Sequence, residues 1–92
     1  MSYVVAGGKY YNLETSQEIH KVSKNHGVEQ EILYRSRKSN YFIAYIDRKE
    51  TPLGGQPKVT ARGITPEEVL SWMEENSTPL EIVKIYFPLE EG

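Results

Sequence analysis

Two similar helix-start motifs near the C-terminal end constrain the fold of this chain more than any other feature. Residues 65–68 (TPEE) combine a capping threonine, a proline suited to the first helical position and a glutamate that closes a capping box. Residues 78–81 (TPLE) repeat the pattern thirteen residues later. The sequence therefore predicts a pair of short helices within residues 66–87, the second of which ends before Pro88.

Neither helix is expected to be stable by itself, because isolated helices shorter than about 12–15 residues are marginal in water. Both must therefore pack against the rest of the chain. The first helix, expected to end near Glu75, carries Trp72 and Met73 on its apolar face. We expect these two side chains to fill a core between helix and sheet; the alternative is that Trp72 is an exposed anchor for a partner.

The surface on which the helices pack is predicted to be a β-hairpin. Residues 28–36 and 41–47 alternate in polarity and are rich in Tyr, Ile and Leu, and residues 37–40 have the composition of a turn. With a three-residue loop, one face of the hairpin is apolar and is expected to be buried, whereas the other is expected to face water. The first face holds Ile32, Tyr34, Phe42, Ala44 and Ile46, and the second holds Leu33, Arg35, Arg37, Tyr41, Ile43 and Tyr45.

The remaining segments complete a single domain spanning residues 1–92. Residues 18–23 read as a further strand or a short helix, because Ile19 and Val22 are three positions apart, and residues 58–62 read as the last strand. Residues 51–57 are loop by composition, and residues 1–8 are a candidate flexible start. The predicted fold class is α+β: an antiparallel meander of three to four strands packed against a C-terminal pair of short helices.

Composition excludes several kinds of site. The 92 residues contain no cysteine, which removes disulfides and thiolate chemistry, and only two histidines, His20 and His26, so we predict no metal site and no cofactor. No serine lies in a nucleophile elbow, and Gly54 and Gly55 do not form a phosphate-loop motif. We therefore expect a protein without catalytic residues. With no apolar run long enough for a membrane span and no export signal at its start, we expect it to be cytoplasmic.

Charge is distributed unevenly along the chain. Residues 1–63 carry ten Lys or Arg and six Asp or Glu, a net +4, whereas residues 64–92 carry seven Glu and one Lys, a net −6. Internal complementarity and solubility account for such a division. The alternative explanation is a surface of one charge sign that docks a partner of the opposite charge.

The hairpin is the best candidate for a binding site. Its predicted outer face and turn bring Arg35, Arg37 and Lys38 close to Tyr41 and Tyr45. Arginine and tyrosine are enriched at protein–protein hot spots, which favours a protein partner. The same residue types bind phosphates and stack on bases, so RNA or single-stranded DNA is the alternative. A solvated hairpin with arginines lying over tyrosine rings is the third interpretation.

Four short motifs occur in order along most of the chain: residues 9–15 (KYYNLET), 33–42 (LYRSRKSNYF), 65–74 (TPEEVLSWME) and 86–88 (YFP). In these motifs the sequence resembles a group of small uncharacterised bacterial proteins that are common in mobile elements and prophages. The group usually has a Gly-rich stretch after its aromatic strand, where this chain has residues 46–50 (IDRKE). The resemblance implies an accessory, non-catalytic protein of phage or mobile-element origin that acts by binding.

Overall fold

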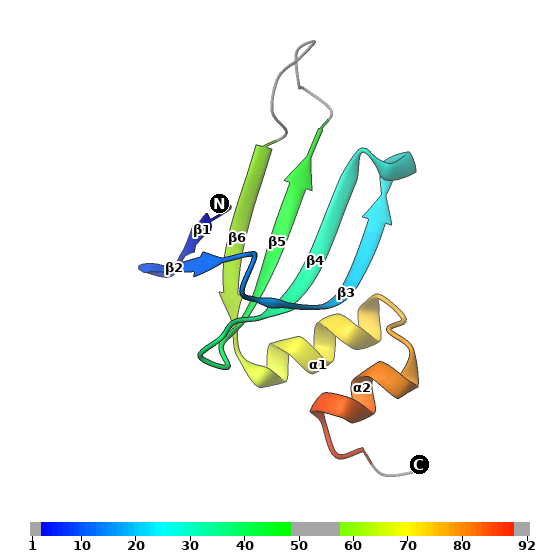
Figure 1. Cartoon of the computed structure of the whole chain (residues 1–92). Helices are drawn as coiled ribbons and strands as arrows, with labels where there is room; N and C mark the ends of the chain where they lie inside the picture. The colour runs from blue at the N-terminus through cyan, green and yellow to red at the C-terminus, as the bar shows by residue number, and fades with distance from the viewer. Residues whose placement is uncertain (1–2, 49–57, 90–92) are drawn as a thin grey trace.

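The computed structural model describes residues 3–48 and 58–89 and confirms the α+β class (Figure 1). One antiparallel sheet has the strand order β3-β4-β5-β6, and a separate two-stranded hairpin precedes it along the chain. Two short helices follow the last strand. The elements are β1 (Tyr3–Ala6), β2 (Lys9–Asn12), β3 (Gln17–Lys24), the short 3-10 helix η1 (Asn25–Gly27), β4 (Glu29–Arg35), β5 (Tyr41–Asp47), β6 (Lys58–Ile64), α1 (Pro66–Glu75) and α2 (Leu80–Tyr86).

The segment that reads as either strand or helix is strand β3. The pairing of β3 with β4 shifts between Glu18 and His20, which marks a β-bulge. In a regular strand, residues three apart point to opposite faces, but one extra residue restores them to the same face. Ile19 and Val22 accordingly both pack into the core beneath the helices. The helix-like spacing of these two residues is therefore the mark of a bulge.

The predicted division of the β4–β5 hairpin into two faces is confirmed by its register. Ile32 lies opposite Ala44 and Tyr34 opposite Phe42, so they share one face. The prediction that the other face points to water is wrong. Leu33, on that face, is fully buried beneath α1.

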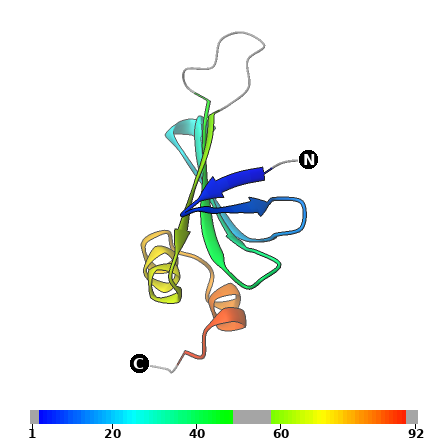
Figure 2. The same cartoon turned by 90° about the vertical axis from the view of Figure 1, so that its left-hand side faces the viewer.

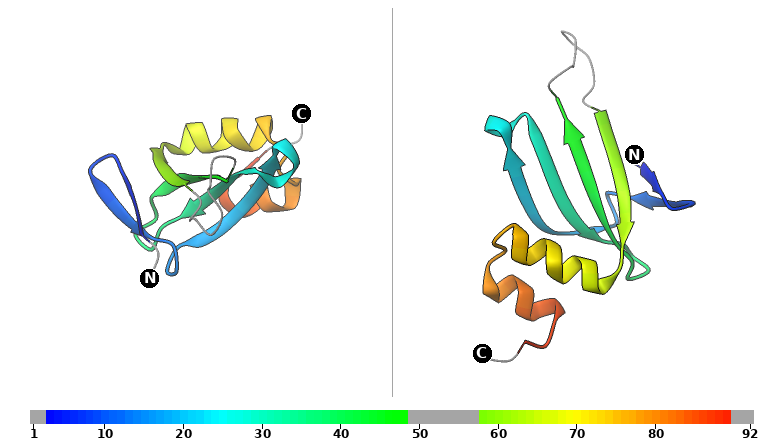
Figure 3. Two further views of the ribbon diagram at one scale, coloured as in Figure 1. Left: turned by 90° about the horizontal axis from the view of Figure 1, so that it is seen from above. Right: turned by 180° about the vertical axis from the view of Figure 1, so that it is seen from behind.

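The helix side of the sheet holds the larger core. Helix α1 crosses one end of this face (Figures 1 and 3) and buries Val69, Trp72 and Met73 against Leu33 and the strands beside it. Trp72 is 6% exposed and Met73 1%, which confirms that they fill the core between helix and sheet.

Part of the opposite side of the sheet, near β6, is covered by the β1–β2 hairpin (Figures 1 and 3), which was not predicted from the sequence. Its two-residue turn, Gly7 and Gly8, has positive φ at both positions, as a tight hairpin turn requires. Figure 2 shows the hairpin and α1 on opposite sides of the sheet. Residues 3–6, within the candidate flexible start, are thus a paired strand.

Three stacked aromatic rings hold the β1–β2 hairpin on the sheet. The rings of Tyr11 and Phe42 lie with centroids 4.3 Å apart, and those of Phe42 and Tyr34 lie 5.1 Å apart. Phe42, at the centre of the stack, is fully buried. Val4 and Ala6 of β1 complete this second core.

The two helix starts differ in their capping. The Thr65 hydroxyl accepts a hydrogen bond from Glu68 N, and the Glu68 carboxylate accepts one from Thr65 N, so the predicted capping box is formed. Thr78 makes no equivalent bond. Pro79 itself is the residue before the first helical turn of α2, so the threonine lies one position too early to cap.

Two further expectations concern the loop before β6 and the absence of a membrane-spanning segment. The loop expected at residues 51–57 lies outside the described residues. No helix in the described part of the chain is long and apolar enough to cross a membrane.

The ring stack predicts a large stability difference between two aromatic positions. Phe42→Ala should lower the free energy of unfolding by about 3–5 kcal/mol, because it removes a fully buried ring and leaves a cavity. Tyr10→Ala, at a tyrosine that is 74% exposed, should change it by less than about 0.5 kcal/mol. Urea unfolding followed by circular dichroism measures both. Equal losses in the two variants would contradict the packing described.

Candidate functional site

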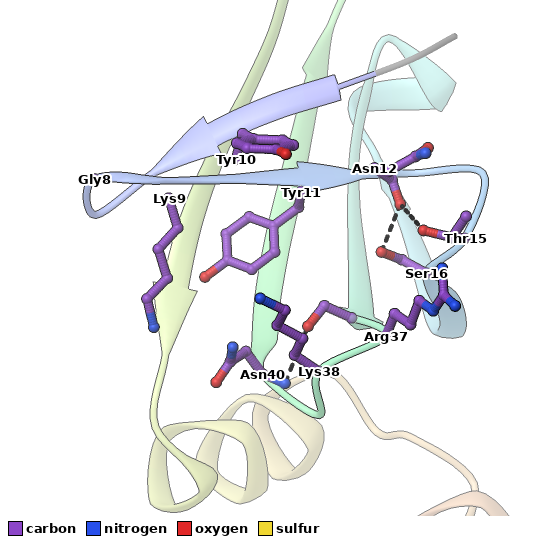
Figure 4. A pocket seen from close by; sticks show the side chains of 11 residues that line it. Gly8, Lys9, Tyr10, Tyr11, Asn12, Thr15, Ser16, Arg37, Lys38 and Asn40 are labelled. Atoms are coloured by element: carbon purple, nitrogen blue, oxygen red, sulfur yellow. Dashed lines mark hydrogen bonds between the residues drawn. The ribbon is translucent and has the colours of Figure 1, made fainter.

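An open groove of about 590 Å³ lies between strand β2 and the loop that joins β4 to β5 (Figure 4). Lys9 and Asn12 line it from β2, and Arg37, Lys38 and Asn40 line it from the loop. The groove exists because the Tyr11 ring, packed on Phe42, holds β2 against the sheet at this distance from the loop.

The β4–β5 loop has a defined conformation. Ser36 N donates to Asn40 O at 2.7 Å and Ser39 N donates to Ser36 O at 2.9 Å. Ser39 has φ +65°, which completes a three-residue loop of the expected kind, a turn followed by one left-handed residue. Arg37 and Lys38 are therefore held at the tip, where both are exposed.

The end of the groove beside β2 is closed by a second turn. The Asn12 carbonyl accepts hydrogen bonds from the Ser16 hydroxyl at 2.7 Å and from Thr15 N at 3.3 Å. The Asn12 side chain accepts one from Glu14 N at 2.9 Å. These bonds fix residues 12–16 as a wall from which Thr15 and Ser16 also contribute to the lining (Figure 4).

The groove is electrostatically positive. Of the residues that line it, Lys9, Arg37 and Lys38 are cations and none is a carboxylate. Within residues 3–48 and 58–89, none of these three cations forms an ion pair; the ion pair found there joins Lys24 to Glu31 on the helix side of the sheet. Uncompensated cations around polar hydrogen-bonding groups suit an anionic ligand.

The five residues predicted to form one binding face are divided by the fold. Arg37 and Lys38 line the groove, and Arg35 lies on the other side of the loop, in a smaller hollow that Arg37 also lines. Tyr41 lies directly opposite Arg35 on the same sheet face, but neither tyrosine lines the groove. Tyr41 is half-buried, with its ring centroid 6.4 Å from that of Phe87, and Tyr45 donates a hydrogen bond to the Glu29 carboxylate at 2.6 Å, toward the far end of β5.

This division has a physical cause. Tyr41 and Tyr45 share the sheet face on which Leu33 and Ile43 are buried, so the face expected to be free contributes to the protein's own core. Arg37 and Lys38, by contrast, lie at the exposed tip of the loop, whereas Arg35 is half-buried opposite Tyr41. Arg37 and Lys38 thus line the groove and Arg35 the adjoining hollow, and the binding role of the five residues stays a prediction.

Sequence reasoning missed the contribution of β2 to the groove. Lys9, Tyr11 and Asn12 were noted as part of a motif but were given no role. A signal was present, because two glycines between alternating apolar and polar residues predict a tight hairpin. The stacking of Tyr11 on Phe42 depends on tertiary packing and has no local signature.

A second polar cluster lies on the helix side of the sheet around Glu31. Burial alone would raise the pKa of this carboxyl, but hydrogen bonds from Lys24 and from Trp72 Nε1, together with the charges of Lys24 and Arg62, hold it below its ordinary value of 4.5. The Trp72 bond is 3.1 Å long. The cluster fixes the core tryptophan to the sheet, so we assign it a structural role.

The ionisation of Tyr34 and the capacity to bind a metal ion also bear on what the described residues can do. Burial, and then the charge of Glu18, raises the pKa of the Tyr34 hydroxyl above its ordinary value of 10.0, so Tyr34 is neutral at physiological pH. The described residues contain no group of three or more His, Asp or Glu side chains able to hold a metal ion.

Comparison with known proteins gives no information about the function of this chain, so its function is inferred from the groove. No protein-family model, no curated protein sequence and no solved structure matches the chain significantly. The resemblance to small mobile-element and prophage proteins therefore stays a prediction.

The lowered pKa of Glu31 predicts a pH-dependent contribution to stability. A depressed pKa in the folded state means that the ionised carboxylate stabilises the fold above the unfolded pKa, and that this contribution is lost as the pH falls through the folded pKa. Glu31→Gln should therefore cost roughly 1 kcal/mol at pH 7, and the difference from the unsubstituted protein should shrink below about pH 4.5.

The matched control for this substitution is Glu75→Gln, the same change at an exposed residue of α1. It should leave the unfolding free energy within about 0.5 kcal/mol across the same pH range. Urea unfolding at several pH values measures both variants. A Glu31→Gln cost that is constant with pH would show that the carboxylate charge has no such role.

Proposed function

We propose that this protein is a small non-catalytic interaction protein that binds an acidic segment of a partner protein in the groove between β2 and the β4–β5 loop. The observation that carries the proposal is the presence of Lys9, Arg37 and Lys38 around a groove whose described lining has no carboxylate. Bound carboxylates would supply the charge that the protein itself does not supply there.

The other groups in the groove suit an extended peptide. Asn12 and Asn40 offer amide donors and acceptors on opposite walls, and Ser16 and Ser36 offer hydroxyls. These groups can hydrogen-bond a peptide backbone while the cations bind its side chains. At about 590 Å³ the groove falls within the usual range for ligand sites, about 300–1,000 Å³.

Two of the rings near the cations are not free to stack on the bases of a single-stranded nucleic acid, which favours a protein partner. Recognition of single strands depends on aromatic side chains that are free to stack on bases. Tyr11 is 7% exposed and is stacked on Phe42, and Tyr41 packs against Phe87. These two rings are thus used in the protein's own packing, whereas Tyr10, which also lines the groove, is 74% exposed.

An apolar patch beside the groove extends the surface available to such a partner. Val5 and Tyr10 are paired across the β1–β2 hairpin and are 72% and 74% exposed, and Tyr3, 49% exposed, lies with its ring against that of Tyr10. Exposed tyrosines next to a charged groove are typical of protein contact surfaces.

The cellular setting is part of the proposal and rests on sequence alone. The resemblance to mobile-element and prophage proteins supports an accessory role in a bacterial cell. The cysteine-free composition is consistent with the cytoplasm.

The proposal is tested with a fluorescein-labelled hexaglutamate peptide as the probe, followed by fluorescence anisotropy at low salt. The unsubstituted protein should bind it, and hexaglutamine should not bind. The double substitution Lys9→Glu with Lys38→Glu should weaken binding at least tenfold, because it reverses two of the three groove charges.

The matched control reverses two exposed lysines that lie outside the groove, Lys21→Glu with Lys84→Glu. It changes the net charge of the protein by the same amount and should leave the affinity within about threefold. Equal losses in the two double variants would mean that the probe responds only to net charge, and the groove would then have no specific role. Tighter binding of an oligothymidylate than of hexaglutamate would favour a nucleic-acid partner instead.

A further inference from the structure

We infer that the acidic segment carries a phosphomonoester, a phosphoserine or phosphothreonine, which is bound between Arg35 and Arg37 on the other side of the β4–β5 loop. This inference rests on the proposed function and identifies the chemistry of the partner more closely. It follows from a second hollow that adjoins the groove.

The hollow has the size and lining of a site for a small anion. Its volume is about 270 Å³, the space of roughly nine water molecules, which accommodates a phosphate group together with a few waters. It is lined by two guanidinium groups, three hydroxyls and one amide, and by no carboxylate: Thr15, Gln17, Arg35, Ser36, Arg37 and Ser39. All of these side chains can donate hydrogen bonds.

Arg35 is positioned before any ligand arrives. Its side chain is half-buried, and its Nη2 donates a hydrogen bond to the Ser39 hydroxyl at 3.2 Å. Its Nε is enclosed and has no hydrogen-bond partner among the described residues. The packing around Nε and the bond to the loop limit the movement of the guanidinium, so little side-chain entropy would be lost on binding.

The donor set distinguishes a phosphomonoester from a carboxylate. A phosphomonoester carries a charge of about −1.5 to −2 at pH 7 and presents three acceptor oxygens, whereas a carboxylate carries one charge and two oxygens. Two planar guanidinium groups beside hydroxyls match the first more completely, because each fork can bind two oxygens. The groove, by contrast, combines one arginine with two lysines, which bind carboxylates as point charges.

The hollow and the groove form one continuous surface around the loop. Arg37, Ser36 and Thr15 line both of them. A segment with a phosphorylated residue in the hollow would pass Arg37 and reach the groove, where acidic residues meet Lys38 and Lys9. The partner we infer is therefore a phosphorylated residue flanked by acidic residues.

The test compares three fluorescein-labelled peptides of equal length by anisotropy: hexaglutamate, the same peptide with one internal serine, and that peptide with the serine phosphorylated. The phosphorylated peptide should bind about tenfold more tightly than the serine peptide. Arg37→Lys keeps the charge but removes the guanidinium fork, so it should reduce this preference to about threefold or less.

Two further variants keep the test decisive. Arg35→Lys should reduce the phosphate preference in the same way, with thermal unfolding used to verify that it folds. Arg48→Lys, at an exposed arginine near the other end of the sheet, should preserve the preference. Equal affinity for the phosphorylated and serine peptides would overturn the phosphate inference while hexaglutamate binding still supported the proposed function. Absence of binding to every peptide would overturn both, and tighter binding of a 5′-phosphorylated oligothymidylate would overturn both in favour of nucleic acid.

Discussion

The stack of Tyr11 on Phe42 and Phe42 on Tyr34 is the interaction on which the rest of the structure depends. Its centroid separations of 4.3 and 5.1 Å bring a ring from the N-terminal hairpin into the surface of the main sheet. A two-stranded hairpin is marginal in water unless it packs on something. Together with the contacts of β1 with β6, this stack holds β2 on the sheet as one wall of the groove beside the β4–β5 loop. Fold and candidate site therefore depend on the same three rings.

The sequence was sufficient for the elements whose signals are local. The capping box at Thr65 and Glu68 predicted α1 with its observed bounds, and alternation predicted β5 and the grouping of residues on each face. The sequence could not indicate which face of the sheet lies beneath the helices, because β4 and β5 are covered on both sides. Leu33 and Phe42 are each fully buried, and they point in opposite directions. Alternation of apolar and polar residues identifies the buried face of a strand only when the other face is exposed to solvent.

The candidate site was predictable to the extent that it is local. Arg37 and Lys38 follow directly from the turn composition of the hairpin, and both lie at the groove. Lys9 comes from a different hairpin and reaches the groove only through the packing of Tyr11, which no local pattern reports. Tyr41 and Tyr45 lie on the expected sheet face, but both are half-buried because that face takes part in the protein's own packing. The resulting surface combines cations around one loop with exposed tyrosines beside it. Helix α1, which carries Glu67, Glu68, Glu74 and Glu75, lies on the side of the sheet opposite the β1–β2 hairpin (Figure 2).

The most direct measurement of the central claim is a two-dimensional nuclear Overhauser spectrum of the protein in solution, with the aromatic resonances assigned. The account predicts cross-peaks between the ring protons of Tyr11 and Phe42, whose centroids are 4.3 Å apart, and between those of Phe42 and Tyr34. Cross-peaks from Phe42 to Tyr34 but none to Tyr11 would mean that the N-terminal hairpin does not pack on the sheet. The groove, and the binding proposed for it, would then have no structural basis.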